Sequence, residues 1–94
     1  PSMDSVVQRT LQIVYEQGLH ARASAKLVEV VERFDAQCDV TKDGITAQGD
    51  SIMGLLMLAA SRGTSIDIHT SGPEAAALAD ALQTLVAEKF GEDM

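Results

Sequence analysis

The sequence is poor in cysteine, aromatic residues and basic residues. One cysteine among 94 residues can neither form an internal disulfide nor complete a multi-cysteine metal site, so the chain fits a reducing compartment and Cys38 is expected in the core. Seven Lys and Arg against fourteen Asp and Glu argue against a nucleic-acid partner, because phosphate backbones require a basic surface. A protein or small-molecule partner fits this charge better.

Long apolar runs and a signal peptide are also missing. No stretch approaches the ~18 to 20 apolar residues of a membrane span, and the N-terminus lacks the basic-then-apolar order of a signal peptide. We therefore expect a cytoplasmic protein without a membrane contact, a metal or a cofactor. Residues 1–2, which precede Met3, are interpreted as a cloning remnant. The absence of repeats and composition breaks predicts a single domain over residues 4–91.

Period-two and helical patterns alternate along the chain and predict an α+β fold. The expected elements are a strand over 6–15, a helix from 21, strands over 37–41 and 45–48, a short helix over 52–60, a strand over 65–70, and a helix from Pro73 whose buried stripe reaches Phe90. This order, βαββαβα, predicts a four-stranded antiparallel sheet with the last strand inserted between the first two. Three helices are expected on one face and solvent on the other, which is an open-faced β-sandwich.

His20 is expected at the start of the first helix, in the segment GLHARAS. The first amides of a helix lack intrahelical acceptors and favour an anion, so the backbones of Ala21 and Ala23 are candidate phosphate ligands. Imidazole can accept a phosphoryl group and release it again, and Arg22 adds a forked cation nearby. A plain helix cap is the alternative for His20, while His69 is interpreted as a strand residue on the solvated sheet face.

Two segments, GLHARAS and GDSIMGLLMLAASRGTSIDI, resemble the motifs of HPr, the histidine-containing phosphocarrier family of the phosphoenolpyruvate-dependent phosphotransferase system. The resemblance covers residues 6–90 and implies an HPr-like fold. It implies that His20 accepts a phosphoryl group through Nδ1 from the phosphorylated first enzyme of the system and passes it to a IIA-type domain, with Arg22 as the arginine of the site. The family's usual proline after this arginine is Ala23 here, which leaves the helix start less rigid.

The resemblance further implies a monomeric carrier, not an enzyme with turnover of its own, acting in sugar transport or nitrogen regulation. The DSIMGLL segment, the acidic charge and the scarcity of aromatic residues favour the nitrogen-type branch found in α-proteobacteria.

Ser51 precedes the second expected helix and has two interpretations. As a plain N-cap it would contribute about 0.5 to 2 kcal/mol. The resemblance instead implies regulatory phosphorylation by a dedicated kinase, with a phosphorylase to reverse it. The run that follows holds more apolar residues than one short helix can bury, so some must face outward, and Leu55 and Leu58 are expected in the core. The expected partner surface consists of Ser24, Leu27, Ile52, Met53 and Leu56.

Three other classes of small protein compete with this interpretation. GDSIMGLL resembles the site of an acyl carrier protein, with Ser51 holding the pantetheine arm, but acyl carriers are helical bundles and this chain has period-two segments. A ferredoxin-like metal chaperone would need a pair of thiols. An ACT-type small-molecule-sensing regulatory domain would predict ligand-dependent dimers and an inert His20.

Overall fold

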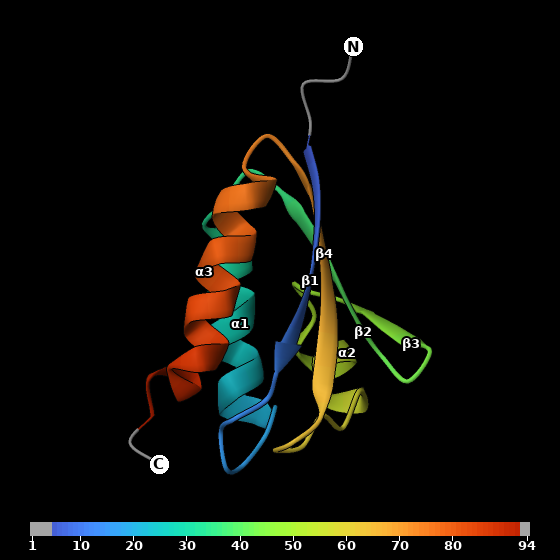
Figure 1. Ribbon diagram of the computed structural model, residues 1–94, viewed down its shortest axis with the longest axis vertical. Helices are drawn as coiled ribbons and strands as arrows, with labels where there is room; N and C mark the ends of the chain where they lie inside the picture. Colours follow the sequence, from blue (N-terminus) through green and yellow to red (C-terminus); the bar gives the residue numbers. More distant parts are fainter. Residues whose placement is uncertain (1–4, 93–94) are drawn as a thin grey trace.

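The computed structural model describes residues 5–92 as a sheet backed by helices (Figure 1). In chain order its elements are β1 (Ser5–Gln12), α1 (Ala21–Glu32), β2 (Gln37–Lys42), β3 (Ile45–Gln48), α2 (Ile52–Met57), β4 (Ser65–Gly72), α3 (Ala75–Ala87) and a 3-10 turn, η1 (Lys89–Gly91). The predicted α+β class and the order βαββαβα are confirmed. The interpreted cloning remnant at residues 1–2 and the expected first domain residue, 4, lie outside the described residues.

The four strands form one antiparallel sheet in the order β1-β4-β2-β3, so β4 is inserted between β1 and β2 as predicted. Side chains alternate between the two faces along each strand. Ile66 and Ile68 of β4 are fully buried, whereas Asp67 and His69 are only partly buried on the opposite face. The sheet therefore has one apolar face and one polar face, and the expected position of His69 is confirmed.

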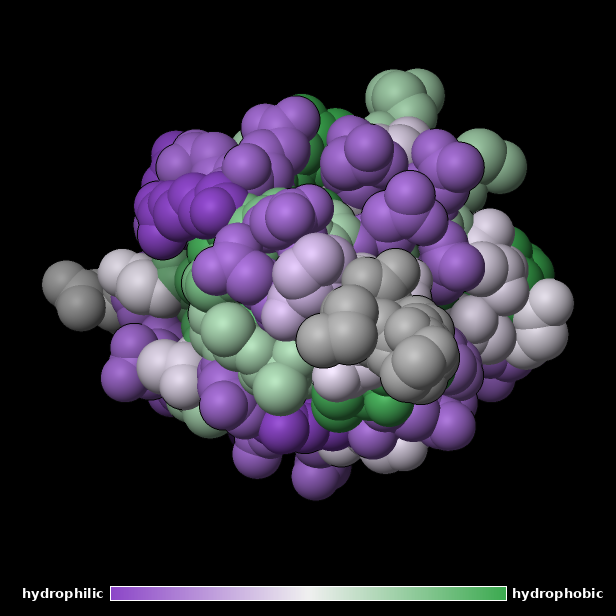
Figure 2. All heavy atoms as spheres, turned by 90° about the horizontal axis from the view of Figure 1, so that it is seen from above, coloured by the Kyte–Doolittle hydropathy of each residue, from purple (hydrophilic) through white to green (hydrophobic). Residues whose placement is uncertain are grey.

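The helices cover the apolar face of the sheet. The ribbons of α1 and α3 run side by side along it, and α2 packs against α1 and β3 (Figure 1). The buried apolar side chains form one cluster that includes Leu55 and Leu58, as expected. Viewed from above, hydrophilic side chains cover most of the surface and hydrophobic ones show only in small patches (Figure 2).

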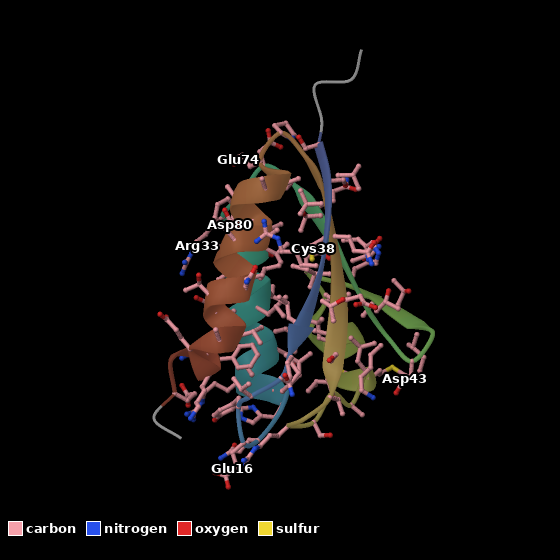
Figure 3. The ribbon with its side chains drawn as sticks, in the orientation of Figure 1. Glu16, Arg33, Cys38, Asp43, Glu74 and Asp80 are labelled. Atoms are coloured by element: carbon pink, nitrogen blue, oxygen red, sulfur yellow. The ribbon has the colours of Figure 1, made fainter. Side chains whose placement is uncertain are left out.

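Cys38 belongs to this cluster and lies 6% exposed, which confirms it as a core residue. Figure 3 shows Cys38 among the strands of the sheet. Burial raises the pKa of its thiol to about 12, and the carboxylates of Asp39 and Asp50 add to this shift. The thiol is therefore protonated at neutral pH and is a poor nucleophile.

Two predicted element ends differ from the structure because backbone contacts override the side-chain pattern. The first strand ends at Gln12, since Ile13 exchanges its backbone hydrogen bonds with Gly63 and Thr64 of a loop; its side chain is nevertheless buried. The second helix ends at Met57 and not at residue 60, because Ala59 adopts a left-handed backbone with φ 51°.

The last helix is also shorter than predicted at both ends. Pro73 is not its first residue: α3 begins at Ala75, because the amide of Glu74 donates to Asp35 and its backbone is non-helical. At the other end α3 stops at Ala87. Phe90 is buried, but it lies in a left-handed turn after α3 and not in the helix that was predicted to carry it. No helix within residues 5–92 is long and apolar enough to cross a membrane.

Candidate functional site

The loop between β1 and α1 lies at the lower end of the molecule, where Figure 3 labels Glu16, and it is fixed by backbone contacts. Gly18 has φ +66°, and a Cβ there would come within 2.6 Å of the Ala60 carbonyl oxygen. The next residue, Leu19, donates its amide to the same carbonyl at 2.8 Å. Because the loop rests on the backbone that follows α2, the position of His20 is set from outside its own segment.

His20 caps the N-terminus of α1. Its Nδ1 atom accepts hydrogen bonds from the amides of Arg22 at 3.1 Å and Ala23 at 3.4 Å. The first intrahelical bond follows, from the amide of Ser24 to the His20 carbonyl at 2.8 Å. The predicted position of His20 at the helix start is thus confirmed, and its Nδ1 atom faces amides that can bind an anion.

The aromatic neighbours of His20 fix the orientation of its ring. Nε2 lies 3.3 Å from the hydroxyl of Tyr15, and the two rings meet edge to face with centroids 5.3 Å apart. Phe90 supports Tyr15 from behind with centroids 5.8 Å apart. Because Nδ1 accepts two N–H groups, the neutral ring carries its proton on Nε2, which leaves the Nδ1 lone pair on the side of the helix amides.

Arg22 projects from the first turn of α1, and its side chain is 70% exposed. Its Nη1 atom contacts Oε1 of Glu92 at 2.9 Å, and Oε2 of the same carboxylate contacts Nζ of Lys26 at 2.9 Å. These two cations hold the pKa of Glu92 below its usual range. The ion pairs are therefore complete at neutral pH and are lost only as the pH falls through that lowered pKa.

An open hollow beside His20 brings these groups together. Its lining residues are Tyr15, Gln17, His20, Ala21, Arg22 and Glu92. The hollow combines an unprotonated ring nitrogen, helix-start amides and a guanidinium, which suits a tetrahedral oxyanion. Among residues 5–92 no group of three His, Cys, Asp or Glu side chains is arranged to hold a metal ion.

Ser51 caps α2, as its N-cap interpretation predicted: its Oγ accepts the amide of Gly54 at 3.0 Å. Ile52 and Met53 follow on the outside, 39% and 70% exposed. Leu56 is half-buried and, with His20, lines a second open hollow between α2 and the β1–α1 loop. The exposed apolar surface of α2 thus adjoins the histidine through Leu56.

Met57 belongs to this surface although the sequence prediction left it out. It is 74% exposed and follows Met53 by one helical turn, so helical spacing alone would have placed the two methionines on one side.

The prediction that Ser24 and Leu27 contribute to a partner surface is wrong for this structure. Both are 0% exposed because their side of α1 faces the sheet. Ser24 instead donates its hydroxyl to the Leu19 carbonyl at 3.1 Å, which helps to fix the loop before His20.

Sequence reasoning also missed three residues of the site. Tyr15 stands at the end of the expected first strand, and its hydroxyl reaches His20. Lys26 follows Arg22 by one helical turn, a spacing that could have placed it on the same side. No local sequence pattern pointed to Glu92 as a site residue, because its contact with Arg22 spans 70 residues of sequence.

A family model described as "PTS HPr component phosphorylation site" matches residues 7–88 of the chain. Among curated proteins, the phosphocarrier protein HPr of Cupriavidus necator is 41% identical over 87 residues, covering 93% of this chain and 98% of the relative. The HPr of Neisseria meningitidis serogroup A is 40% identical over the same shares.

Solved structures agree with these sequence relatives. An HPr crystal structure from Thermoanaerobacter tengcongensis superposes with a TM-score of 0.88 at 33% identity, covering 94% of this chain and 99% of that one. An HPr from Bacillus anthracis gives 0.83 at 38% identity, over 87% of this chain and 98% of that one. A sheet with helices on one face, and not a helical bundle, is thus common to all three chains, which disfavours the acyl-carrier alternative.

Proposed function

Because the chain belongs to the HPr family of phosphocarrier proteins, we propose that Nδ1 of His20 accepts a phosphoryl group from the phosphorylated first enzyme of the phosphotransferase system and donates it to a IIA-type domain. Membership of the family implies that the chain interacts with enzymes of this system. It also implies that the chain is a phosphoryl carrier and not itself an enzyme. The observation that supports this assignment best is that Nδ1 faces the amides of Arg22 and Ala23 at the start of α1.

In the transfer step the Nδ1 lone pair forms a bond to phosphorus while the bond from phosphorus to the donor's leaving atom breaks. The electron pair of the broken bond stays on the leaving atom, so the donor is regenerated. Negative charge spreads over the three phosphoryl oxygens in such a transition state. The guanidinium of Arg22 and the first amides of α1, including those of Ala21 and Ala23, are placed to stabilise that charge.

The amides change partners during this step. In the unphosphorylated chain they donate to Nδ1, and after transfer the Nδ1 lone pair is used in the bond to phosphorus. The phosphoryl oxygens then accept hydrogen bonds from these amides. Because the fold already orients these donors, the helix start needs little reorganisation. Tyr15 holds the far side of the ring and keeps its orientation. The acceptor domain recovers the phosphoryl group by the reverse displacement.

The apolar residues beside His20 fit the role of a docking surface for both partners. Ile52, Met53 and Leu56 were expected there, and the exposure of Met57 extends the surface. Methionine side chains adapt to more than one partner shape. We further propose that residues 4–91 act as a single phosphocarrier domain, as a monomer in the cytoplasm. The assignment to the nitrogen-type branch stays a prediction.

The direct test is to incubate the chain with catalytic amounts of the first enzyme and phosphoenolpyruvate labelled with ³²P. We expect one phosphoryl group per chain, lost in acid and retained in base, because phosphoramidates of histidine hydrolyse in acid. Peptide mapping should place the label in the segment that carries His20. An unlabelled chain, or a label that survives acid, would contradict the proposal.

Ser51→Asp is expected to slow phosphoryl transfer to His20 by about tenfold or more, because it places a charge beside the apolar docking surface at Ile52 and Met53. Folding should be retained, since Asp caps a helix about as well as Ser. The measurement is the initial rate of labelling at limiting first enzyme, with a thermal melt of each variant.

Ser51→Ala is the matched control for this prediction. It removes the cap to Gly54 at a cost of about 1 kcal/mol, so its melting temperature should fall while its transfer rate stays near that of the wild type. Equal transfer rates for the Asp variant and the wild type would show that Ser51 is a structural cap and not a regulatory site.

A further inference from the structure

The carboxylate of Glu92 is paired with Arg22, the cation that a phosphoryl group on His20 needs. Its two oxygens are divided between Arg22 and Lys26, each at 2.9 Å, and its side chain is only 17% exposed. Arg22 is the guanidinium of the hollow around His20, and Glu92 lines the same hollow. The Glu92 carboxylate thus pairs with the same guanidinium that a phosphoryl group on His20 would bind.

Lys26 anchors the segment that carries Glu92. Besides its contact with the carboxylate, its Nζ atom donates to the Phe90 carbonyl at 2.9 Å. Phe90 is fully buried against Tyr15, so the chain is fixed two residues before Glu92. Figure 1 shows the end of the described chain at the same end of the molecule as the start of α1. The carboxylate is therefore held near the site and is not a chance surface contact.

Arg22 can leave this ion pair more readily than Lys26 can. The Arg22 side chain is 70% exposed and contacts Glu92 through one nitrogen, whereas Lys26 is 35% exposed and also bonded to a backbone carbonyl. A phosphoryl group on Nδ1 carries more charge than a carboxylate and offers three oxygens to the guanidinium. The exchange of partners at Arg22 is thus favoured once His20 is phosphorylated.

We propose that Glu92 is a positioning residue that competes with the phosphoryl group for Arg22: it holds the guanidinium beside His20 in the unphosphorylated chain and stays on Lys26 when the phosphoryl group takes Arg22. This rests on His20 as the phosphoacceptor. An interaction made only in the unphosphorylated chain lowers the free energy of that state alone. Glu92 therefore weakens the hold of the chain on its phosphoryl group and favours onward donation.

The test measures the equilibrium between two chains directly. Wild-type and Glu92→Gln chains are mixed in equal amounts with catalytic first enzyme and a limiting amount of phosphoenolpyruvate. One chain of each pair is labelled uniformly with ¹⁵N, because Glu and Gln have nearly the same mass, and intact mass spectrometry at neutral pH then gives the phosphorylated fraction of each chain. We expect the variant to hold about two- to fivefold more phosphoryl group than the wild type, the range given by the loss of one exposed ion pair. Because the measurement is made at equilibrium, it does not depend on docking rates.

Glu88→Gln is the matched control, because it removes the same charge from an exposed carboxylate four residues earlier. It should share the phosphoryl group equally with the wild type. A Glu92→Gln ratio no larger than that of Glu88→Gln would overturn the inference while leaving the phosphocarrier assignment intact. The absence of phosphorylation on every chain would instead contradict the assignment itself.

A second competition isolates the part played by Arg22. Arg22→Gln is mixed with the double variant Arg22→Gln, Glu92→Gln under the same conditions. If Glu92 acts by occupying Arg22, the two chains share the phosphoryl group about equally. An undiminished preference for the double variant would mean that Glu92 repels the phosphoryl group through space, and the proposed competition for Arg22 would be wrong.

Discussion

His20→Ala is expected to abolish phosphoryl acceptance, whereas His69→Ala leaves it at the wild-type rate. The first substitution removes the imidazole that lines the hollow with Arg22. The second removes an imidazole from the polar face of the sheet, opposite the buried side chains of β4. The measurement is the amount of acid-labile label per chain after incubation with the first enzyme and labelled phosphoenolpyruvate.

A stability control separates loss of chemistry from loss of folding. His20 also caps α1, and its replacement by alanine removes the acceptor of two amides at a cost of about 0.5 to 2 kcal/mol. Asparagine is a good N-cap but forms no phosphoramidate of this kind. His20→Asn should therefore melt close to the wild type and still accept no phosphoryl group. Label in either variant of His20 would place the phosphoacceptor elsewhere in the chain.

Gly18→Ala is expected to lower the free energy of unfolding by about 2 to 4 kcal/mol, which is large for one methyl group. Two causes add. The left-handed backbone at φ +66° costs an alanine about 1 kcal/mol or more, and the new Cβ meets the Ala60 carbonyl oxygen at 2.6 Å and Cα of Ser61 at 2.9 Å. The loop must then move away from the segment that follows α2. The measurement is urea unfolding followed by circular dichroism.

Gly44→Ala is the control for the backbone term. Gly44 has φ +81°, but a Cβ there would meet nothing within 4 Å, so only the conformational cost of about 1 kcal/mol applies. The difference between the two variants measures the contact with Ala60. The same movement should open the bond from the Leu19 amide and displace His20, so Gly18→Ala should also transfer more slowly, unlike Gly44→Ala. Equal losses of stability would mean that the loop has room to shift.

The β-sheet could be predicted well because its signals are local. Ile66 and Ile68 alternate with polar neighbours, and a strand with one buried face shows that alternation directly. The order of strands followed from handedness and connection rules. Element ends were less accurate, because they depend on backbone contacts such as that between Glu74 and Asp35, which leave no trace in the hydrophobic pattern.

The candidate site divides in the same way. His20 and Arg22 share one helix start, so a short motif was enough to place them together. Ser24 and Leu27 were assigned to a partner surface, and their complete burial contradicts this. Tyr15 was predicted only as the end of the first strand, and the path of the loop brings its hydroxyl to the ring.

The sequence by itself determined the α+β class, the apolar face of each element and the histidine at the start of a helix, because each depends on residues within a few positions of one another. The tertiary structure alone decided which groups from outside that helix start surround the histidine. Glu92 reaches Arg22 across 70 residues because a buried Phe90 and a left-handed turn direct the chain back to α1. Contacts of this length depend on the packing of the whole chain, and no local pattern of residues encodes them.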